Sequence, residues 1–393
     1  MTASEGSRGR TIWLLSLAAF ASAASMRACD SLLPALAQSF AITAGEAART
    51  ISMFALVYGL VQMLYGPLGD RHGKLRVITL AASAGVAVSL GAMLAPGIRT
   101  LIGFRAAGGA IAAGIIPLSM AWIGDQIAYE HRQATLARFL MGQMLGVIGG
   151  QFLGGVCADH LGWRWTFGFL AATYLVAAAA LWTQAVGLDP AGSAPRRGFL
   201  HQIASVARIR WPRVIFATVF FEGLAVFGAL AFIPSDLHRR FGVSLTLAGL
   251  APSAFGLGGL CYAVFARRLL ARLGEPGLVR LGAALLAIGL AGLALGGAWL
   301  LAIPESGLIG IGFYMLHNTL QTHATQMAPS NRGTAVSMFS SCFFLGQSAG
   351  VSIASTLVDA VGTWSVFAAA APVVIGVTSA FLPALRRHRR APG

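Results

Sequence analysis

Residues 50–94 read TISMFALVYGLVQMLYGPLGDRHGKLRVITLAASAGVAVSLGAML, which is two apolar runs separated by the polar hexapeptide GDRHGK at 69–74. Each run approaches the roughly 20 residues that a helix needs to cross the hydrocarbon core of a bilayer. The hexapeptide holds Asp70, Arg71 and Lys74, whose charges are costly to bury in lipid. We therefore predict two membrane-spanning helices joined by a short loop in water.

The same alternation continues along the whole chain. The predicted spans are 11–38, 47–67, 75–95, 98–122, 134–157, 163–186, 213–236, 245–266, 277–297, 300–324, 333–356 and 363–383. Composition agrees, since 56% of the residues are hydrophobic and 10% are charged, against roughly 25% charged in soluble domains. We expect an all-α membrane protein with twelve transmembrane helices.

The formal net charge of +15 has a distribution that predicts topology. With a cytoplasmic N-terminus, 21 of the 28 Lys and Arg residues fall on the cytoplasmic side, five on the other side, and Arg27 and Arg105 inside spans. Basic residues accumulate in cytoplasmic loops. We predict a multi-pass inner-membrane protein with both termini in the cytoplasm. The basic tail at 386–390 is interpreted as a topology anchor, so no nucleic-acid partner is expected.

Shifting the sequence by 200 residues aligns matching residues along much of its length. The matches include Pro34 with Pro234, Gln126 with Gln326, Arg132 with Arg332 and Asp159 with Asp359. This repeat predicts two pseudo-symmetric six-helix bundles, 1–188 and 213–393, with a cytoplasmic linker at 189–212. Halves that each have an even number of spans are typical of parallel repeats, which are related by an axis along the membrane normal. The stretch 198–211 is predicted as a short amphipathic helix or as plain linker.

The loop at 66–76 reads GPLGDRHGKLR and resembles the signature G-x-L-x-D-R-x-G-R/K of the major facilitator superfamily. The resemblance implies that fold and a secondary transporter. It also implies a gating loop that latches the two halves together in the outward-facing state. The loop residues concerned are Gly66, Asp70, Arg71, Gly73 and Lys74. The alternative is a topological turn with no gating role.

Two more segments resemble motifs of this family. Residues 101–114 carry Arg105 followed by a glycine pair, which is similar to the fourth-span pattern with a buried arginine. Residues 146–155 resemble the fifth-span motif of exporters, although Gln151 stands where that motif has proline. The glycines concerned are Gly146, Gly150, Gly154 and Gly155. Small residues let helices approach closely, so these glycines indicate either a packing seam or antiport.

Ionisable side chains inside spans are rare here, and such groups usually mark function. They are Arg27 and Asp30 in the first span, Arg105 in the fourth, Glu222 in the seventh, and His317 and His323 in the tenth. In the family that the chain resembles, these spans line the central cavity. Desolvation and a neighbouring arginine act on the pKa of a buried carboxyl in opposite directions. We interpret Asp30 and Glu222, with Arg27 and Arg105, as proton-coupling residues; a static Arg27–Asp30 or Arg105–Asp30 ion pair is the alternative.

The remaining polar and aromatic side chains of the central spans predict the substrate cavity. They are Tyr58, Gln62, Gln143, Phe220, Phe221, Phe227, His317, Asn318, Gln321 and Gln347. The sequence has no P-loop and no metal-ligand spacing, so we expect neither an enzyme nor a cofactor or metal. The predicted function is proton-coupled efflux of a small organic or amphipathic solute by a monomer in the lipid bilayer. Uptake, amphiphile translocation and a non-transporting sensor are the alternatives.

Overall fold

The computed structural model describes residues 3–185 and 199–390, and every regular element within them is a helix. The first half of the chain holds α1 (Ala3–Arg27), α2 (Leu33–Phe40), α3 (Ala44–Ala47), α4 (Arg49–His72), α5 (Lys74–Met93), α6 (Ile98–Gln126), α7 (Tyr129–His160) and α8 (Arg164–Ala185). The second half holds α9 (Phe199–Arg208), α10 (Arg210–Leu230), α11 (Ile233–Phe241), α12 (Leu245–Ala248), α13 (Leu250–Leu295), α14 (Ala302–Gln326), α15 (Arg332–Ala360) and α16 (Trp364–Arg390). Two short 3-10 helices, η1 (Trp299–Leu301) and η2 (Pro329–Asn331), precede α14 and α15.

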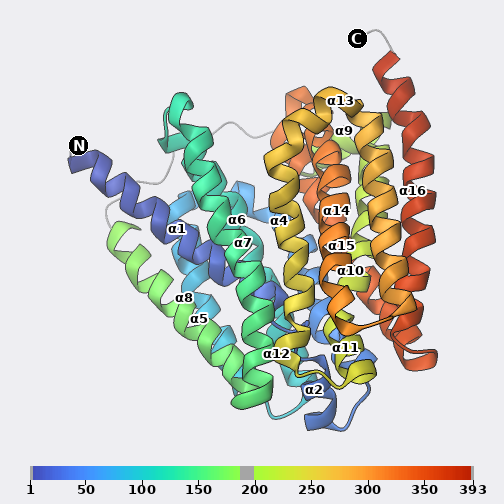
Figure 1. The fold of residues 1–393 in the computed structure, drawn as a ribbon. Helices are drawn as coiled ribbons and strands as arrows, with labels where there is room; N and C mark the ends of the chain where they lie inside the picture. The colour runs from blue at the N-terminus through green and yellow to red at the C-terminus, as the bar shows by residue number, and fades with distance from the viewer. Residues whose placement is uncertain (1–2, 186–198, 391–393) are drawn as a thin grey trace.

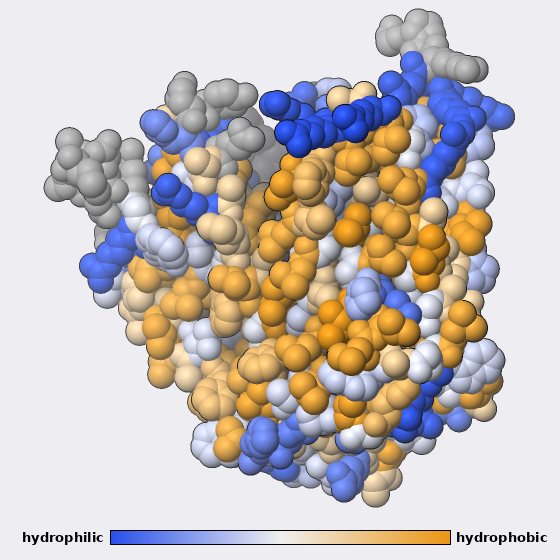
Figure 2. Space-filling view, in the orientation of Figure 1, coloured by the Kyte–Doolittle hydropathy of each residue, from blue (hydrophilic) through white to orange (hydrophobic). Residues whose placement is uncertain are grey.

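The long helices form one bundle with two groups, α1 to α8 on one side and α10 to α16 on the other (Figure 1). Helix α1 begins and α16 ends at the same end of the bundle, which we call the termini face. The other end is called the opposite face. Apolar side chains cover the middle of the bundle and hydrophilic side chains gather at both ends (Figure 2). This distribution is the one expected of a bundle that lipid surrounds at mid-height.

Ten helical stretches of the described chain are long and apolar enough to cross a membrane, and α1 is not among them. One of the ten, Leu245–Leu295, is far longer than a single crossing requires. Within it, α13 turns at Gly274, whose φ is 63°. Glycine adopts such a positive φ without the steric cost that a Cβ would bring. The structure therefore supports a helical membrane protein with ten such stretches, whereas the sequence predicted twelve spans.

The prediction of one continuous helix over 11–38 is wrong. Helix α1 ends at Arg27, a turn follows, and α2 begins at Leu33 with Pro34 in its first turn. Proline lacks a backbone N–H and is tolerated in the first turn of a helix but not in its interior. The second half breaks in the same register, because α11 begins at Ile233 with Pro234 in its first turn. The break places Asp30 in a non-helical turn.

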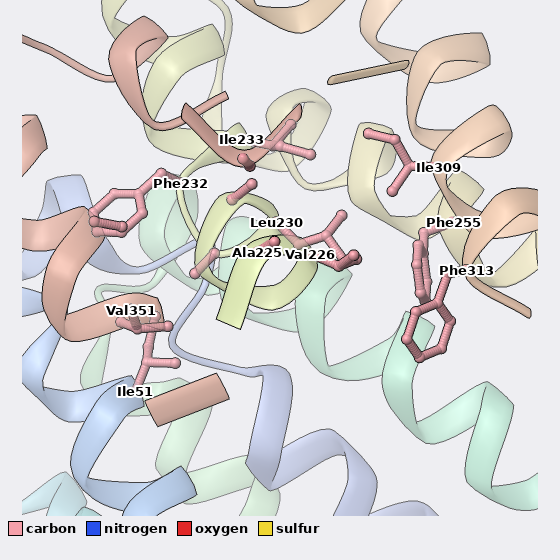
Figure 3. Close-up of a cluster of buried hydrophobic side chains, with 14 of the residues drawn as sticks. Ile51, Ala225, Val226, Leu230, Phe232, Ile233, Phe255, Ile309, Phe313 and Val351 are labelled. Carbon is pink, nitrogen blue, oxygen red and sulfur yellow. The ribbon is translucent and has the colours of Figure 1, made fainter. Parts of the chain in front are cut away.

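The two halves pack through α4 against α15 and through α7 against α12 and α13. Ile51 of α4 and Val351 of α15 lie against each other in one buried apolar cluster (Figure 3). Beside them, the Ser348 hydroxyl donates a hydrogen bond of 2.8 Å to the carbonyl oxygen of Ser52. The interface is therefore built of ordinary core packing with a few polar contacts.

Of the predicted linker, residues 189–198 lie outside the described ranges. Beyond them α9 confirms the helical alternative for that stretch. Side chains of η2 and α15 hold it, since Asn331 donates to Ser205 over 3.1 Å and Thr334 donates to Gln202 over 3.0 Å. Helix α9 is thus attached to the second half at the termini face.

Candidate functional site

The opposite face is closed by two carboxylates that reach from one half to the other. Asp159, near the end of α7, accepts hydrogen bonds from the backbone N–H groups of Leu245 (3.0 Å) and Thr246 (2.7 Å) at the start of α12. Asp359, near the end of α15, accepts from the backbone N–H of Gly45 (3.0 Å) and the hydroxyl of Thr43 (2.7 Å) at the start of α3. The first N–H groups of a helix lack intrahelical partners, so each carboxylate supplies an acceptor across the interface.

The termini face holds a cleft of about 690 Å³ between the halves. One wall comes from α4, α5 and α6 and includes Gln62, Asp70 and Lys74. The other wall comes from α14 and α15 and includes Gln326 and Arg332. The halves are therefore joined by these hydrogen bonds at one end and separated by a cleft at the other.

Arg27 and Asp30 form an ion pair of 2.9 Å in the turn after α1, and their side chains are 3% and 0% exposed. The Gln151 side-chain amide donates a longer hydrogen bond of 3.4 Å to the same carboxylate. Within the described chain, Asp30 Oδ1 and Arg27 Nε and Nη1 have no hydrogen-bond partner. Across the interface, Arg27 lies over the ring of Phe227, 5.0 Å from its centroid. The pair thus lies where the first half meets the second.

Arg105 makes no direct contact with Asp30. Its guanidinium donates to the carbonyl oxygens of Ser25 (2.7 Å) and Thr50 (3.2 Å) and lies over the Phe54 ring. Backbone carbonyls on α1 and α4 therefore bind this cation, and of the two ion pairs that the sequence left open only Arg27–Asp30 is formed.

Glu222 of α10 and His317 of α14 are paired, with 2.8 Å between Oε2 and Nδ1. The carboxylate is 0% exposed and the imidazole 15% exposed. The imidazole stacks on Phe313 at 4.8 Å between ring centroids, and Phe343 lies 5.1 Å away. Phe343 in turn contacts Phe227 at 5.2 Å. Aromatic rings thus connect the Glu222–His317 pair with the Arg27–Asp30 pair.

The other predicted cavity residues are dispersed. Tyr58 is buried against Phe344 of the other half, with 4.1 Å between ring centroids. Gln62 lines the cleft, whereas Gln347 is buried. Phe221 is 44% exposed and Gln321 is exposed. Gln143, Phe220 and Asn318 are half-buried, and Asn318 is hydrogen-bonded to Tyr262.

The predicted gating loop has contacts within its own half. Asp70 pairs with Lys74 over 3.3 Å, and Lys74 also pairs with Asp125 over 2.6 Å. Gly66 lines the cleft, Arg71 is exposed, and Gly73 has a positive φ of 86° between α4 and α5. In this conformation the cleft separates Asp70 from α15.

The four motif glycines of α7 face two different partners. A Cβ at Gly146 or Gly150 would meet backbone carbonyls of α1, and a Cβ at Gly154 would meet the carbonyl of Ala28 in the turn after α1. A Cβ at Gly155 would meet the carbonyl of Leu245 in the other half. The glycines therefore lie where helices approach within backbone contact.

Sequence reasoning missed two parts of this site. It named Glu222 and His317 in separate roles, although they are in contact. It identified Asp159 and Asp359 as a repeat pair but gave them no role. The sequence did carry a signal for a role of Asp159 and Asp359. A carboxylate at the end of one predicted long helix recurs 200 residues later at the end of another.

Comparisons with known proteins agree on one family. The family model described as Major Facilitator Superfamily matches residues 15–348. The chain is 23% identical over 358 residues to the uncharacterized MFS-type transporter YceJ of Bacillus subtilis (strain 168), a match that covers 88% of each protein. It is 24% identical over 276 residues to a chloramphenicol resistance protein of Pseudomonas aeruginosa, covering 66% of this chain and 62% of that protein. A solved bacterial homolog of the human lysosomal transporter Spinster, in an inward-facing and unoccupied conformation, has a TM-score of 0.77 at 17% identity, with 97% of each chain covered.

Proposed function

This chain belongs to the major facilitator superfamily, and on that premise we propose that it exports a small organic or amphipathic solute across the inner membrane in exchange for protons. Transport proceeds by alternating access between two six-helix halves, 1–188 and 213–393. Counting α1 with α2 as one span, and the two arms of α13 as two, gives the twelve spans of this proposal. The basic residues at the termini face argue that this face is cytoplasmic.

The observation that carries the proposal is the asymmetry between the two ends of the bundle. Asp159 and Asp359 hold the halves together at the opposite face, and a cleft of about 690 Å³ separates them at the termini face. A transporter that works by alternating access needs two states, each open at one end only. With cytoplasmic termini, this conformation is the inward-facing one.

Buried carboxylates support proton coupling. Asp30 and Glu222 are fully buried. Asp30 pairs with Arg27, which lies over Phe227 of the other half, and Glu222 pairs with His317 of its own half. Acidic side chains inside membrane proteins commonly form proton relays. The similarity to a chloramphenicol resistance protein favours export as the direction.

The test is transport in proteoliposomes with the pH gradient imposed in either direction. A panel of neutral, cationic and anionic amphipathic solutes is offered, with empty liposomes and ionophore-collapsed gradients as controls. We expect at least one solute to accumulate on the acidic side and to stop accumulating when the gradient is collapsed. Movement toward the alkaline side would contradict export, and movement of no solute at all would favour a sensor.

A further inference from the structure

The Glu222–His317 pair has the composition of an organic-cation site. The imidazole ring lies among three phenyl rings, with centroid distances of 4.8 Å to Phe313, 5.1 Å to Phe343 and 5.4 Å to Phe339. The Glu222 carboxylate also contacts the imidazole, with 2.8 Å between its Oε2 and the ring Nδ1. Aromatic faces together with a desolvated carboxylate are the groups that recognise ammonium ions. In this structure the His317 side chain occupies the position of such a ligand.

We propose, resting on the transport function above, that this cluster is an exchange site at which an organic ammonium ion replaces the His317 imidazolium as the counter-ion of Glu222. When the substrate cation binds, the imidazole turns out of the cage and its proton passes to water. When a proton returns to the imidazole, His317 pairs with Glu222 again and the organic cation leaves. Charge is conserved at each step, because one cation replaces another at a single carboxylate.

Two further observations support exchange at this pair. Glu222 Oε1 is buried and, among the described residues, has no hydrogen-bond partner, so the carboxylate has an oxygen left to face a bound cation. The imidazole is 15% exposed whereas the carboxylate is 0% exposed. The histidine is therefore the member of the pair whose side chain the protein does not cover completely.

In the Arg27–Asp30 pair the cation is a guanidinium and not an imidazole. A guanidinium stays protonated at any accessible pH, so a proton exchanged at the Arg27–Asp30 pair would have to be carried by Asp30 itself. Titratable or charged side chains of the surrounding elements include Tyr262 on α13, Tyr314 on α14, Cys342 on α15 and Arg27 at the end of α1. Tyrosine and cysteine ordinarily titrate at about pH 10 and 8.5. Within the Glu222–His317 pair, the imidazole is the member that can give up its positive charge, because histidine has both a charged and a neutral form at physiological pH.

The test measures binding of benzyltrimethylammonium, whose charge is permanent, to the full-length protein in detergent. Between pH 8 and pH 5.5 the apparent Kd is expected to rise by about tenfold per unit once a proton competes. Binding at pH 6 should release about one proton per cation into a weakly buffered solution. Glu222→Gln should weaken binding by at least about tenfold, and His317→Gln should keep binding while losing proton release and the pH dependence.

Neopentylbenzene, the uncharged isostere, and the variant Glu305→Gln, a half-buried acid in the first turn of α14, are the matched controls. Neither the isostere nor that variant should change benzyltrimethylammonium binding. Equal affinity in Glu222→Gln and wild type, or unchanged proton release in His317→Gln, overturns the exchange site. If Glu222→Gln does not fold, the proton count in His317→Gln decides alone. Solute transport that persists without cation binding leaves the transport function intact while this inference fails.

Discussion

Asp159 and Asp359 stand 200 residues apart and make the same contact in opposite directions across the interface between the halves. Asp159 of the first half accepts from the backbone of Leu245 in the second, at 3.0 Å. Asp359 of the second half accepts from the backbone of Gly45 in the first, also at 3.0 Å. The acceptors and the donors are both related by the 200-residue repeat. We call the two contacts the reciprocal caps.

Removing the reciprocal caps should open the opposite face. Replacing a helix-capping side chain by alanine costs about 1 kcal/mol, and about 1.4 kcal/mol corresponds to a tenfold change in an equilibrium constant. Asp159→Ala and Asp359→Ala should each shift the equilibrium toward the state open at this face by about fivefold. The double variant should shift it by roughly thirtyfold if the two contacts add.

Spin labels on Gln38 of α2 and Arg239 of α11 can measure this shift, because both positions are exposed and the two helices adjoin at that face. The native cysteines are replaced first. We expect a longer inter-label distance to gain population in the single variants and to dominate in the double variant. Glu305→Gln serves as the control, since this acid lies beside Gly289 and Gly292 of its own half. Unchanged distance distributions in the double variant would show that the caps do not hold the closed state.

Asp30→Asn should abolish transport driven by the pH gradient. Because removing one member of a buried ion pair can cost about 3–5 kcal/mol in stability, the single variant confounds coupling with folding. The double variant Arg27→Gln/Asp30→Asn removes both charges and should recover abundance in the membrane. Flux in proteoliposomes is compared between wild type and this double variant. If the double variant still responds to the gradient as wild type does, the ion pair is structural.

Gly150→Ala should lower the stability of the protein. A Cβ at this position would stand against the carbonyl oxygen of Ala24 on α1, and forcing extra atoms into a packed core costs about 1–3 kcal/mol. Thermal unfolding in detergent should therefore begin at a lower temperature than for wild type. Gly103→Ala is the matched control, because no atom lies within 4 Å of a Cβ there. That variant should be no less stable, since alanine favours helix over glycine; equal stability of the two variants would refute close packing at Gly150.

The sequence predicts the helical membrane class, the repeat and the candidate polar residues, because hydropathy and charge placement follow directly from contact with lipid. It does not predict the break before Pro34, since a proline in an apolar stretch can also lie inside a membrane-spanning helix. Nor does it predict that Glu222 and His317 touch, because they are 95 residues apart on different helices. That contact depends on how α10 and α14 are rotated about their axes, which packing decides. Two of the three groups from which Asp159 accepts are backbone N–H groups, which leave no trace in side-chain patterns; the third is the Thr246 hydroxyl.

Asp70 should act only in the state that is closed at the termini face. In the present conformation the Asp70 side chain is 59% exposed and contacts Lys74. Across the cleft lie Arg332 and the beginning of α15. Closing the cleft would bring Asp70 toward an arginine and toward helix N–H groups without intrahelical partners. The reciprocal caps use the same kind of contact at the other face.

Asp70→Asn should therefore increase the population of the conformation described here. A hydrogen bond to a charged group contributes about 1.5–3 kcal/mol, and a contact present in one state alone shifts the equilibrium by its full energy. The population ratio should move by roughly ten- to a hundredfold toward the state open at the termini face. Solute flux should fall while solute affinity in detergent stays unchanged. The Gln38–Arg239 label pair should report fewer molecules open at the opposite face. Asp125→Asn is the control, because Asp125 also binds Lys74 but does not line the cleft. If Asp70→Asn matches Asp125→Asn in flux and in label distances, the loop is a topological turn without a gating role.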